Sequence, residues 1–140
     1  MRVLRFKYGL CLIGLLLALL GCATMQNMAV NDTEILRARA NLRWQALLKR
    51  DWDGAYAYEL PAYRNTHDVK QFSSKFGSKV LWKEAKVTTV DITKDSSLAD
   101  IKVLIKYEIM MSDGEILASD KTANERWIKQ ENEWWLSSSE

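Results

Sequence analysis

The stretch 99-ADIKVLIKYEIMM-111 carries the clearest structural signal in the chain. Apolar side chains stand at every second position, and charged side chains lie between them. The apolar series is Ala99, Ile101, Val103, Ile105, Tyr107, Ile109 and Met111, and the charged residues are Asp100, Lys102, Lys106 and Glu108. Such alternation is typical of a β-strand with one buried face. We therefore expect a long, half-buried strand at 99–111.

The residues on either side of this strand predict an antiparallel meander. The sequence Ser-Asp-Gly at 112–114 is typical of a tight turn, after which 115–129 should return as the next strand. A second hairpin around 131–132 leads into the sequence WWLS. Upstream, the apolar positions of 80–92 change phase, as a β-bulge would cause. Four antiparallel strands are therefore expected.

A helix is expected before these strands. Asn31 and Glu34 have the spacing of a capping box, so the helix should start near Asp32. Apolar residues then recur at helical spacing and should form the buried face. They are Leu36, Ala40, Trp44 and Leu47.

Two more helices should follow the first. Asp51 or Asp53 can cap a helix that Pro61 ends. Thr66 is a plausible cap for a third helix at 67–76, with Gly77 as a left-handed C-cap. The predicted fold class is α+β, with three N-terminal helices packed on one face of a four-stranded antiparallel sheet.

The N-terminus has the pattern of a secretory signal. Arg2, Arg5 and Lys7 precede the uncharged run 10–20, which is too short for a typical transmembrane helix. Leu19-Leu20-Gly21-Cys22 resembles the lipobox of bacterial lipoproteins. The resemblance implies that 1–21 is a cleaved signal peptide and that Cys22 carries the lipid. A secreted protein with a free Cys22 is the alternative.

The lipobox resemblance also implies a location. Two or more acyl chains give stable membrane attachment, and Ala23 in place of an Asp points to the outer membrane, facing the periplasm. In a source without an outer membrane, the outer face of the plasma membrane is expected. Residues 22–31 would form a lipidated tether, whose segment 23–30 spans at most about 30 Å. A single domain is expected at 32–140.

Composition excludes several functions. The formal net charge of +2 depends on the basic residues of the signal peptide, so residues 22–140 show no excess of positive charge for nucleic acid. The lipobox resemblance implies that Cys11 is lost with the signal and that Cys22 is acylated, which would leave no thiol for a disulfide, a metal or catalysis. The remaining glycines are too scattered for a phosphate loop, and no G-x-S-x-G occurs. No cofactor is expected.

The order of elements resembles the nuclear transport factor 2-like superfamily. The resemblance rests on the Trp-bearing first helix, which runs into LLKRDWDGAYAYELPAYR at 47–64, and on long strands that end in NEWWL at 132–136. It implies a strongly curved sheet wrapped around the first helix as a cone, with a cavity between them. Members include ketosteroid isomerases, dehydratases, small-ligand binders and dimerising adaptors, so the fold alone decides little about function.

Candidate catalytic groups are few. His67 is the only histidine, which excludes a two-histidine zinc site within the chain, and its place at a helix start favours a solvent-facing residue. Asp51 and Asp53 lack the other acids of a calcium loop, so capping is preferred and no metal is expected. An isomerase-like enzyme would need a buried carboxylate base, for which Asp91 and Asp120 are the main candidates. We do not expect an enzyme.

The cavity implied by the resemblance should be apolar if the odd-numbered residues of 99–111 face it. Its candidate polar groups are the hydroxyls and indole nitrogens of six aromatic residues, for which plain core packing is the alternative. They are Tyr56, Tyr58, Tyr63, Trp82, Tyr107 and Trp127.

Two features predict a partner surface. Trp134 and Trp135 are neighbours in a strand and must point to opposite faces, so one of them is hard to bury unless a terminal segment covers it. Arg39, Arg43 and Arg50 fall within about 40° of each other on the first helix. This stripe could meet lipid phosphates or an acidic partner, or it could be an ordinary solvated face.

The sequence therefore predicts a lipid-anchored, non-catalytic binding or protein-interaction module at the periplasmic face of the outer membrane. Its partners would be the membrane, through Cys22, and another envelope protein or a second copy of the chain. The alternative is a small apolar ligand carrier, or an isomerase-like or dehydratase-like enzyme that uses the cavity.

Overall fold

The computed structural model describes residues 31–77 and 79–138. The chain divides into two compact units, 1–34 and 35–140, and the architecture below is that of the second unit. The predicted signal peptide, Cys22 and segment 23–30 lie outside the described residues. Within the described part, no helix is both long and apolar enough to cross a membrane.

The first helix occupies residues 31–48 of the described part. Its predicted buried face is confirmed, because Leu36, Ala40, Trp44 and Leu47 are all at most 6% exposed. Residue 31 is already helical, so Asn31 is not the N-cap that the sequence predicted.

Three short helices follow: α2 (Trp52–Tyr56), α3 (Pro61–Arg64) and α4 (Val69–Ser74). Of the two predicted caps, Asp51 is the one that caps α2, accepting a hydrogen bond from the Gly54 backbone N–H. The prediction of three helices is wrong, because Pro61 opens a helix of its own. Proline suits the first helical position, where its missing N–H has no partner to lose.

The start of α4 also differs from the prediction. Asp68, not Thr66, caps this helix, and it forms a capping box with Gln71. The Thr66 hydroxyl instead donates a hydrogen bond to the Tyr63 carbonyl.

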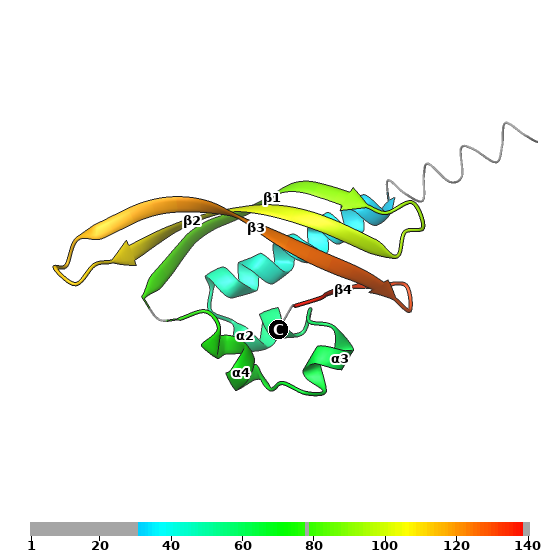
Figure 1. Cartoon of the computed structure of the whole chain (residues 1–140), viewed down its shortest axis with the longest axis horizontal. Coiled ribbons are helices and arrows are strands. Elements are labelled where there is room, and N and C mark those ends of the chain that lie inside the picture. Colours follow the sequence, from blue (N-terminus) through cyan, green and yellow to red (C-terminus); the bar gives the residue numbers. More distant parts are fainter. Residues whose placement is uncertain (1–30, 78, 139–140) are drawn as a thin grey trace, which may run out of the picture. The chain divides into compact units, whose positions relative to one another are not determined.

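The sheet contains β1 (Val80–Ile92), β2 (Leu98–Met110), β3 (Ile116–Gln130) and β4 (Glu133–Leu136). The strands are antiparallel neighbours in chain order, which confirms the predicted meander, and they bend along their length (Figure 1). Register shifts in β1 confirm the expected bulge.

The two later hairpin turns have backbone geometry that their residues favour. Gly114, in the β2–β3 turn, has a φ of 88°. Glu131 and Asn132 both have positive φ, as a two-residue turn between β3 and β4 requires.

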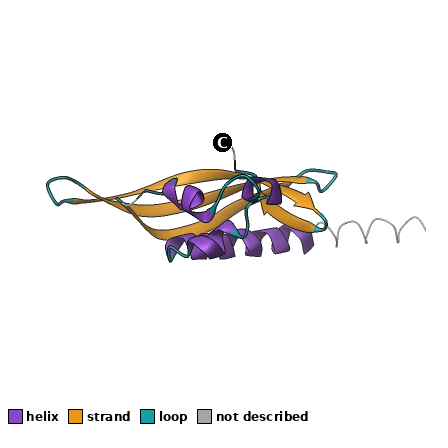
Figure 2. Ribbon diagram, turned by 90° about the horizontal axis from the view of Figure 1, so that it is seen from below, coloured by secondary structure: helices purple, strands orange, loops and turns teal. Residues whose placement is uncertain are grey.

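One face of the sheet packs on the first helix, which runs along it (Figure 2). The odd-numbered residues of β2 face the core, since Ala99, Ile101, Val103 and Ile105 are at most 1% exposed, which confirms the predicted half-buried strand. The opposite face is charged, and its side chains form ion pairs across the strands, such as Lys106–Glu84 at 2.8 Å and Arg126–Asp100 at 3.0 Å.

The segment between α2 and α3 is joined to the end of β4. The Leu60 N–H donates to the Leu136 carbonyl, and the Leu136 N–H donates to the Tyr58 carbonyl, both at 2.9 Å. Trp134 and Leu136 bury their side chains in the core. The last strand is therefore held by β3 on one side and by the α2–α3 connection on the other.

The hairpin of β2 and β3 extends past the end of the first helix (Figure 1). In β3, residues 116–122 are all exposed, although the same strand becomes buried at Glu125 and Trp127. We call residues 108–122 of this hairpin, together with Val80 and Leu81 at the start of β1, the hairpin end.

Candidate functional site

Two adjoining pockets form an open groove beside the sheet. The first pocket, of about 480 Å³, is lined mainly by apolar and aromatic side chains. The second, of about 650 Å³, is lined mainly by polar and charged side chains, which include Arg43 and Glu125 of the core network and Asp100 and Arg126 of the charged face. Because Trp44, Lys75 and Phe76 border both pockets, the groove changes from apolar to polar along its length.

Aromatic rings build one wall of the apolar pocket. The Trp82 ring lies 5.6 Å from that of Trp44 and 5.3 Å from that of Phe76, measured between centroids. Trp52 stacks on the other side of this cluster, 5.6 Å from Phe76. Edge-to-face and offset contacts of this kind hold rings in fixed positions, so this wall is pre-formed.

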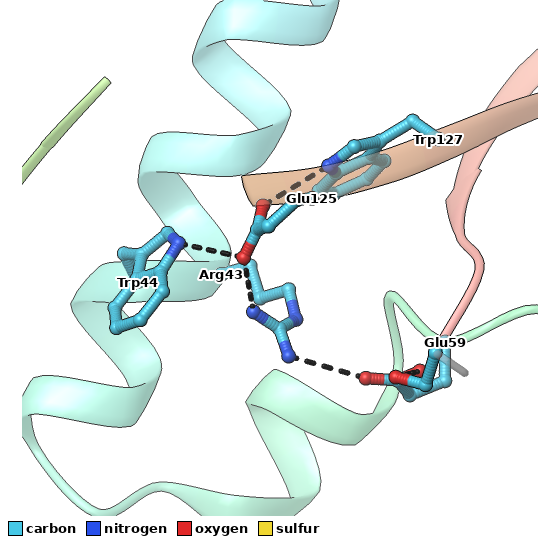
Figure 3. Close-up of polar contacts among 6 residues, drawn as sticks. Arg43, Trp44, Glu59, Glu125 and Trp127 are labelled. Atoms are coloured by element: carbon cyan, nitrogen blue, oxygen red, sulfur yellow. Dashed lines mark hydrogen bonds and ion pairs between the residues drawn. The ribbon is translucent and has the colours of Figure 1, made fainter. Parts of the chain in front are cut away.

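A buried carboxylate lies at the border with the polar pocket. Glu125 Oε1 accepts hydrogen bonds from Arg43 Nη1 at 2.9 Å and from Trp44 Nε1 at 2.8 Å. Its Oε2 accepts one from Trp127 Nε1 at 3.0 Å (Figure 3). Both oxygens therefore already have donors from the protein.

Arg43 bridges this carboxylate to a second one. Its Nη2 donates to Glu59 Oε1 at 3.2 Å, and the other Glu59 oxygen accepts from Ser138 Oγ at 2.7 Å. Glu59 is fully buried and Arg43 is 4% exposed. One guanidinium thus serves two buried carboxylates, and the network joins the first helix, the α2–α3 connection, β3 and the segment after β4.

Burial has a clear electrostatic effect on this network. Desolvation raises the pKa of the Glu125 carboxyl, and attraction to Arg43 with hydrogen bonds from Trp127 and Trp44 opposes the rise. A carboxyl with a raised pKa in a pocket is a feature of catalytic acids. Here both oxygens are held by fixed donors, so the arrangement serves to join elements of the fold.

The structure corrects one predicted surface residue. Arg43 was expected on an exposed arginine stripe, and this is wrong because its side chain is buried between two carboxylates. The sequence contained a signal for this position. Arg43 lies seven residues after Leu36 and four before Leu47, on the buried stripe of the first helix.

The six predicted cavity residues divide into two groups. Trp82 and Tyr107 line the apolar pocket. The other four have partners elsewhere, and Trp127 is fully buried against Glu125. The Tyr56 hydroxyl donates to the His67 carbonyl, Tyr63 stacks on His67, and Tyr58 lies beneath the Arg39 guanidinium.

The predicted catalytic candidates lie apart from the groove or in structural contacts. Asp91 and Asp120 are exposed, and Asp120 lies with Lys106 on the charged face of the sheet. His67 is half-buried against the Tyr63 ring, with centroids 4.2 Å apart, which differs from the expected solvent-facing position. Among residues 31–77 and 79–138, no group of three or more metal-ligating side chains occurs.

Trp134 and Trp135 point to opposite sides, as a strand requires. Trp134 is 1% exposed, so it belongs to the core and not to a partner surface as one prediction had it. Trp135 is half-buried, with the guanidinium groups of Arg39 and Arg64 at 5.0 and 5.1 Å from its ring. Arg39 also donates to the Trp134 carbonyl, so protein groups already engage these predicted contact residues.

An apolar surface that the sequence analysis missed lies at the hairpin end. Leu81, Met110, Met111 and Ile116 are between 45% and 66% exposed and line an open pocket of about 530 Å³. We call these four residues the hairpin patch. Arg50, which the sequence placed on a partner surface, lines the same pocket.

No protein-family model matches the sequence, and no curated protein matches it. Several solved structures resemble the fold. A SEC-C motif containing protein from Rhodopseudomonas palustris has a TM-score of 0.51 at 16% identity, over 70% of this chain and 71% of that one. One from Psychrobacter arcticus has a TM-score of 0.50 at 16% identity, over 76% of this chain and 60% of that one.

The association domain of C. elegans CaMKII has a TM-score of 0.49 at 13% identity, over 77% of this chain and 92% of that one. At these identities the likeness to the SEC-C motif proteins concerns the fold alone. In this chain that fold is an α+β architecture in which helices pack on a four-stranded antiparallel sheet.

Proposed function

We propose that this protein is a lipid-anchored envelope protein that acts by binding a protein partner, without catalysis. Its domain is of the nuclear transport factor 2-like cone type, an assignment supported by the bent sheet and by the SEC-C motif neighbours. The lipobox Leu19-Leu20-Gly21-Cys22 supports attachment at the periplasmic face of the outer membrane.

The hairpin patch is the observation that carries this proposal. Met110 and Ile116 are cross-strand neighbours, and Leu81 is paired with Glu108 one strand away, so three of its residues share a face of the sheet. Elsewhere that face carries ion pairs such as Lys106–Glu84. A cluster of exposed apolar side chains on a charged surface marks an interaction site.

The position of the patch suits a protein anchored by its N-terminus. Near its N-terminal end, the first helix contacts the middle of β1 through Arg37, which donates to the Val87 carbonyl. Beyond its C-terminal end, Arg50 reaches the start of β1 at Val80. The hairpin end therefore lies at the opposite end of the unit from residue 35, where the chain enters from the anchor side.

The positions of the carboxylates Glu125, Asp91 and Asp120 favour a binding role over a catalytic one. Both oxygens of Glu125 accept hydrogen bonds from Arg43 and two tryptophans, which leaves it poorly placed to take a proton from a substrate. Asp91 and Asp120, on which an enzymatic role depended, are exposed.

Site-specific photocrosslinking tests the partner surface. A photoreactive amino acid is placed at Met110, at Ile116 or at Leu42 of the full chain in its own cell envelope. Leu42 is the matched control, because it is 52% exposed but lies on the first helix. We expect one discrete adduct from positions 110 and 116 and none from position 42, and its mass tells a second copy of the chain from another protein.

The absence of an adduct at the hairpin positions, or equal adducts at all three, would contradict the proposal. The anchor is tested separately by palmitate labelling, which Cys22→Ala should abolish. Retained labelling in that variant would exclude lipidation at Cys22.

A further inference from the structure

The apolar pocket of the groove has two cations at its edge. Lys75 of the α4 C-cap and Lys121 of β3 both line this pocket. Neither ammonium forms an ion pair within 4.0 Å among the described residues. Lys75 Nζ lies 4.8 Å from the centroid of the Tyr63 ring, a contact that leaves its N–H donors available.

The nearby carboxylates do not neutralise these lysines. Glu125 is held by Arg43 and the indole N–H groups of Trp44 and Trp127. Asp120 lies in a pocket with Lys106 on the other face of the sheet. The apolar pocket therefore presents positive charge without an internal counter-charge.

The rest of the pocket is suited to an apolar body. In the strand register, Lys121 is opposite Ile105 and Tyr107 is opposite Ser119, so Lys121 and Tyr107 are diagonal neighbours. The hydroxyl of Tyr107 and the ammonium of Lys121 thus border the same apolar surface, with Trp82 across the next strand pair. The volume of about 480 Å³ is in the range of small-molecule sites.

We propose that this pocket binds an amphipathic organic acid. Its apolar body lies against Trp82, Phe76 and Ile105, and its carboxylate is held by Lys75 and Lys121. Charge-assisted hydrogen bonds from the ammonium groups select the anion over a neutral analogue. This activity goes beyond the proposed protein interaction and uses the face of the sheet opposite to Leu81, Met110 and Ile116, so either can fail without the other.

Isothermal titration with a matched pair of probes tests the pocket. The probes are 2-naphthoate and 2-naphthamide, which share an aromatic body and differ in charge. The mature lipidated protein is titrated in dodecyl maltoside, and a titration into protein-free micelles is subtracted. We expect 2-naphthoate to bind at least about tenfold more tightly than 2-naphthamide.

Charge-removing variants locate the effect. Lys75→Gln/Lys121→Gln should weaken 2-naphthoate binding by about tenfold or more and leave 2-naphthamide binding unchanged within about twofold. Lys102→Gln is the matched control, because Lys102 is an exposed lysine of β2 outside this pocket. Lys121→Gln alone, an exposed change, gives a smaller loss in the same direction if the double variant is unstable.

Three outcomes would overturn the proposal. They are no binding of 2-naphthoate by the wild type, equal binding of the acid and the amide, and an equal loss in Lys102→Gln. The last would show that the acid responds to overall charge and not to the pocket.

Discussion

Strands β2 and β3 run through both ends of the sheet, yet the two ends differ in burial. Where the first helix covers β2 and β3, Ile101 and Trp127 are fully buried. At the hairpin end, Ile116 is 63% exposed and Leu117 52% exposed, although they lie on opposite faces of β3. An alternating strand pattern thus predicts which residues share a face, and only the packing of another element decides whether that face is buried.

The largest effect is expected for a charge at the covered end. Arg43→Met leaves Glu59 and Glu125 buried without their counter-charge, so the free energy of unfolding should fall by about 3–5 kcal/mol. Arg126→Met is the matched control, because its partner Asp100 is exposed on the charged face and the stability should hardly change. Urea denaturation measures both, and equal losses would show that burial does not set the strength of these ion pairs.

The same substitution at both ends tests the comparison directly. Ile101→Ala should lower the free energy of unfolding by about 2–5 kcal/mol, because it removes buried methyl groups and leaves a cavity. Ile116→Ala should change it by no more than about 0.5 kcal/mol in the isolated protein, since that side chain is exposed. A loss at position 116 as large as at 101 would mean that the hairpin end is buried in the free protein.

The pH dependence of stability distinguishes buried from exposed carboxyls. Burial raises the pKa of the Glu125 carboxyl above its ordinary value of 4.5. Between 4.5 and the raised pKa, the folded state therefore holds a proton that the unfolded state has lost. The stability of the wild type relative to Glu125→Gln should therefore fall as the pH rises above 4.5. Urea unfolding from pH 3 to pH 8 checks this sign.

Glu84 is the control with the opposite sign. Its exposed hydrogen bond and ion pair with Lys106 lower the pKa of the Glu84 carboxyl, so its contribution is present above 4.5 and is lost as the pH falls through the lowered value. The stability of the wild type relative to Glu84→Gln should therefore rise with pH. The same slope in both comparisons would contradict the assignment of Glu125 as desolvated.

The smallest global effect is expected in the β2–β3 turn. Gly114→Ala places a side chain on a backbone with a φ of 88°, which costs about 1 kcal/mol locally. Hydrogen exchange of the amides at 116–122 should quicken by about fivefold while the core amides keep their rates. A matching loss of protection at Ile101 would show that the hairpin end and the core unfold as one unit.

Much of the fold could be predicted from the sequence because periodicity is a local property. The helical spacing of Leu36, Ala40 and Leu47 gave the first helix, and the alternation in 99–111 gave the longest unbroken strand signal. The helix count could not be predicted, because Pro61 is compatible with ending one helix or opening the next.

The candidate site was harder to predict because its residues come together only in the fold. Glu59 and Glu125 are far apart in sequence, and neither stands in a motif that points to the other. Only Arg43 carried a signal, through its place on the apolar stripe of the helix. No sequence signal predicted the exposure of Ile116. The length by which a hairpin extends past its covering helix depends on how the elements pack, which a local pattern does not show.

The contact of residues 58–60 with the end of β4 and with Ser138 has a consequence for the timing of folding. The core of this unit needs Trp134 and Leu136, and the carboxylate of Glu59 needs Ser138. A ribosome that has reached β3 has therefore not yet made the residues that close the core. A chain that cannot finish folding until residue 138 has been synthesised stays unfolded for longer. This suits a protein that is proposed to cross a membrane before it folds.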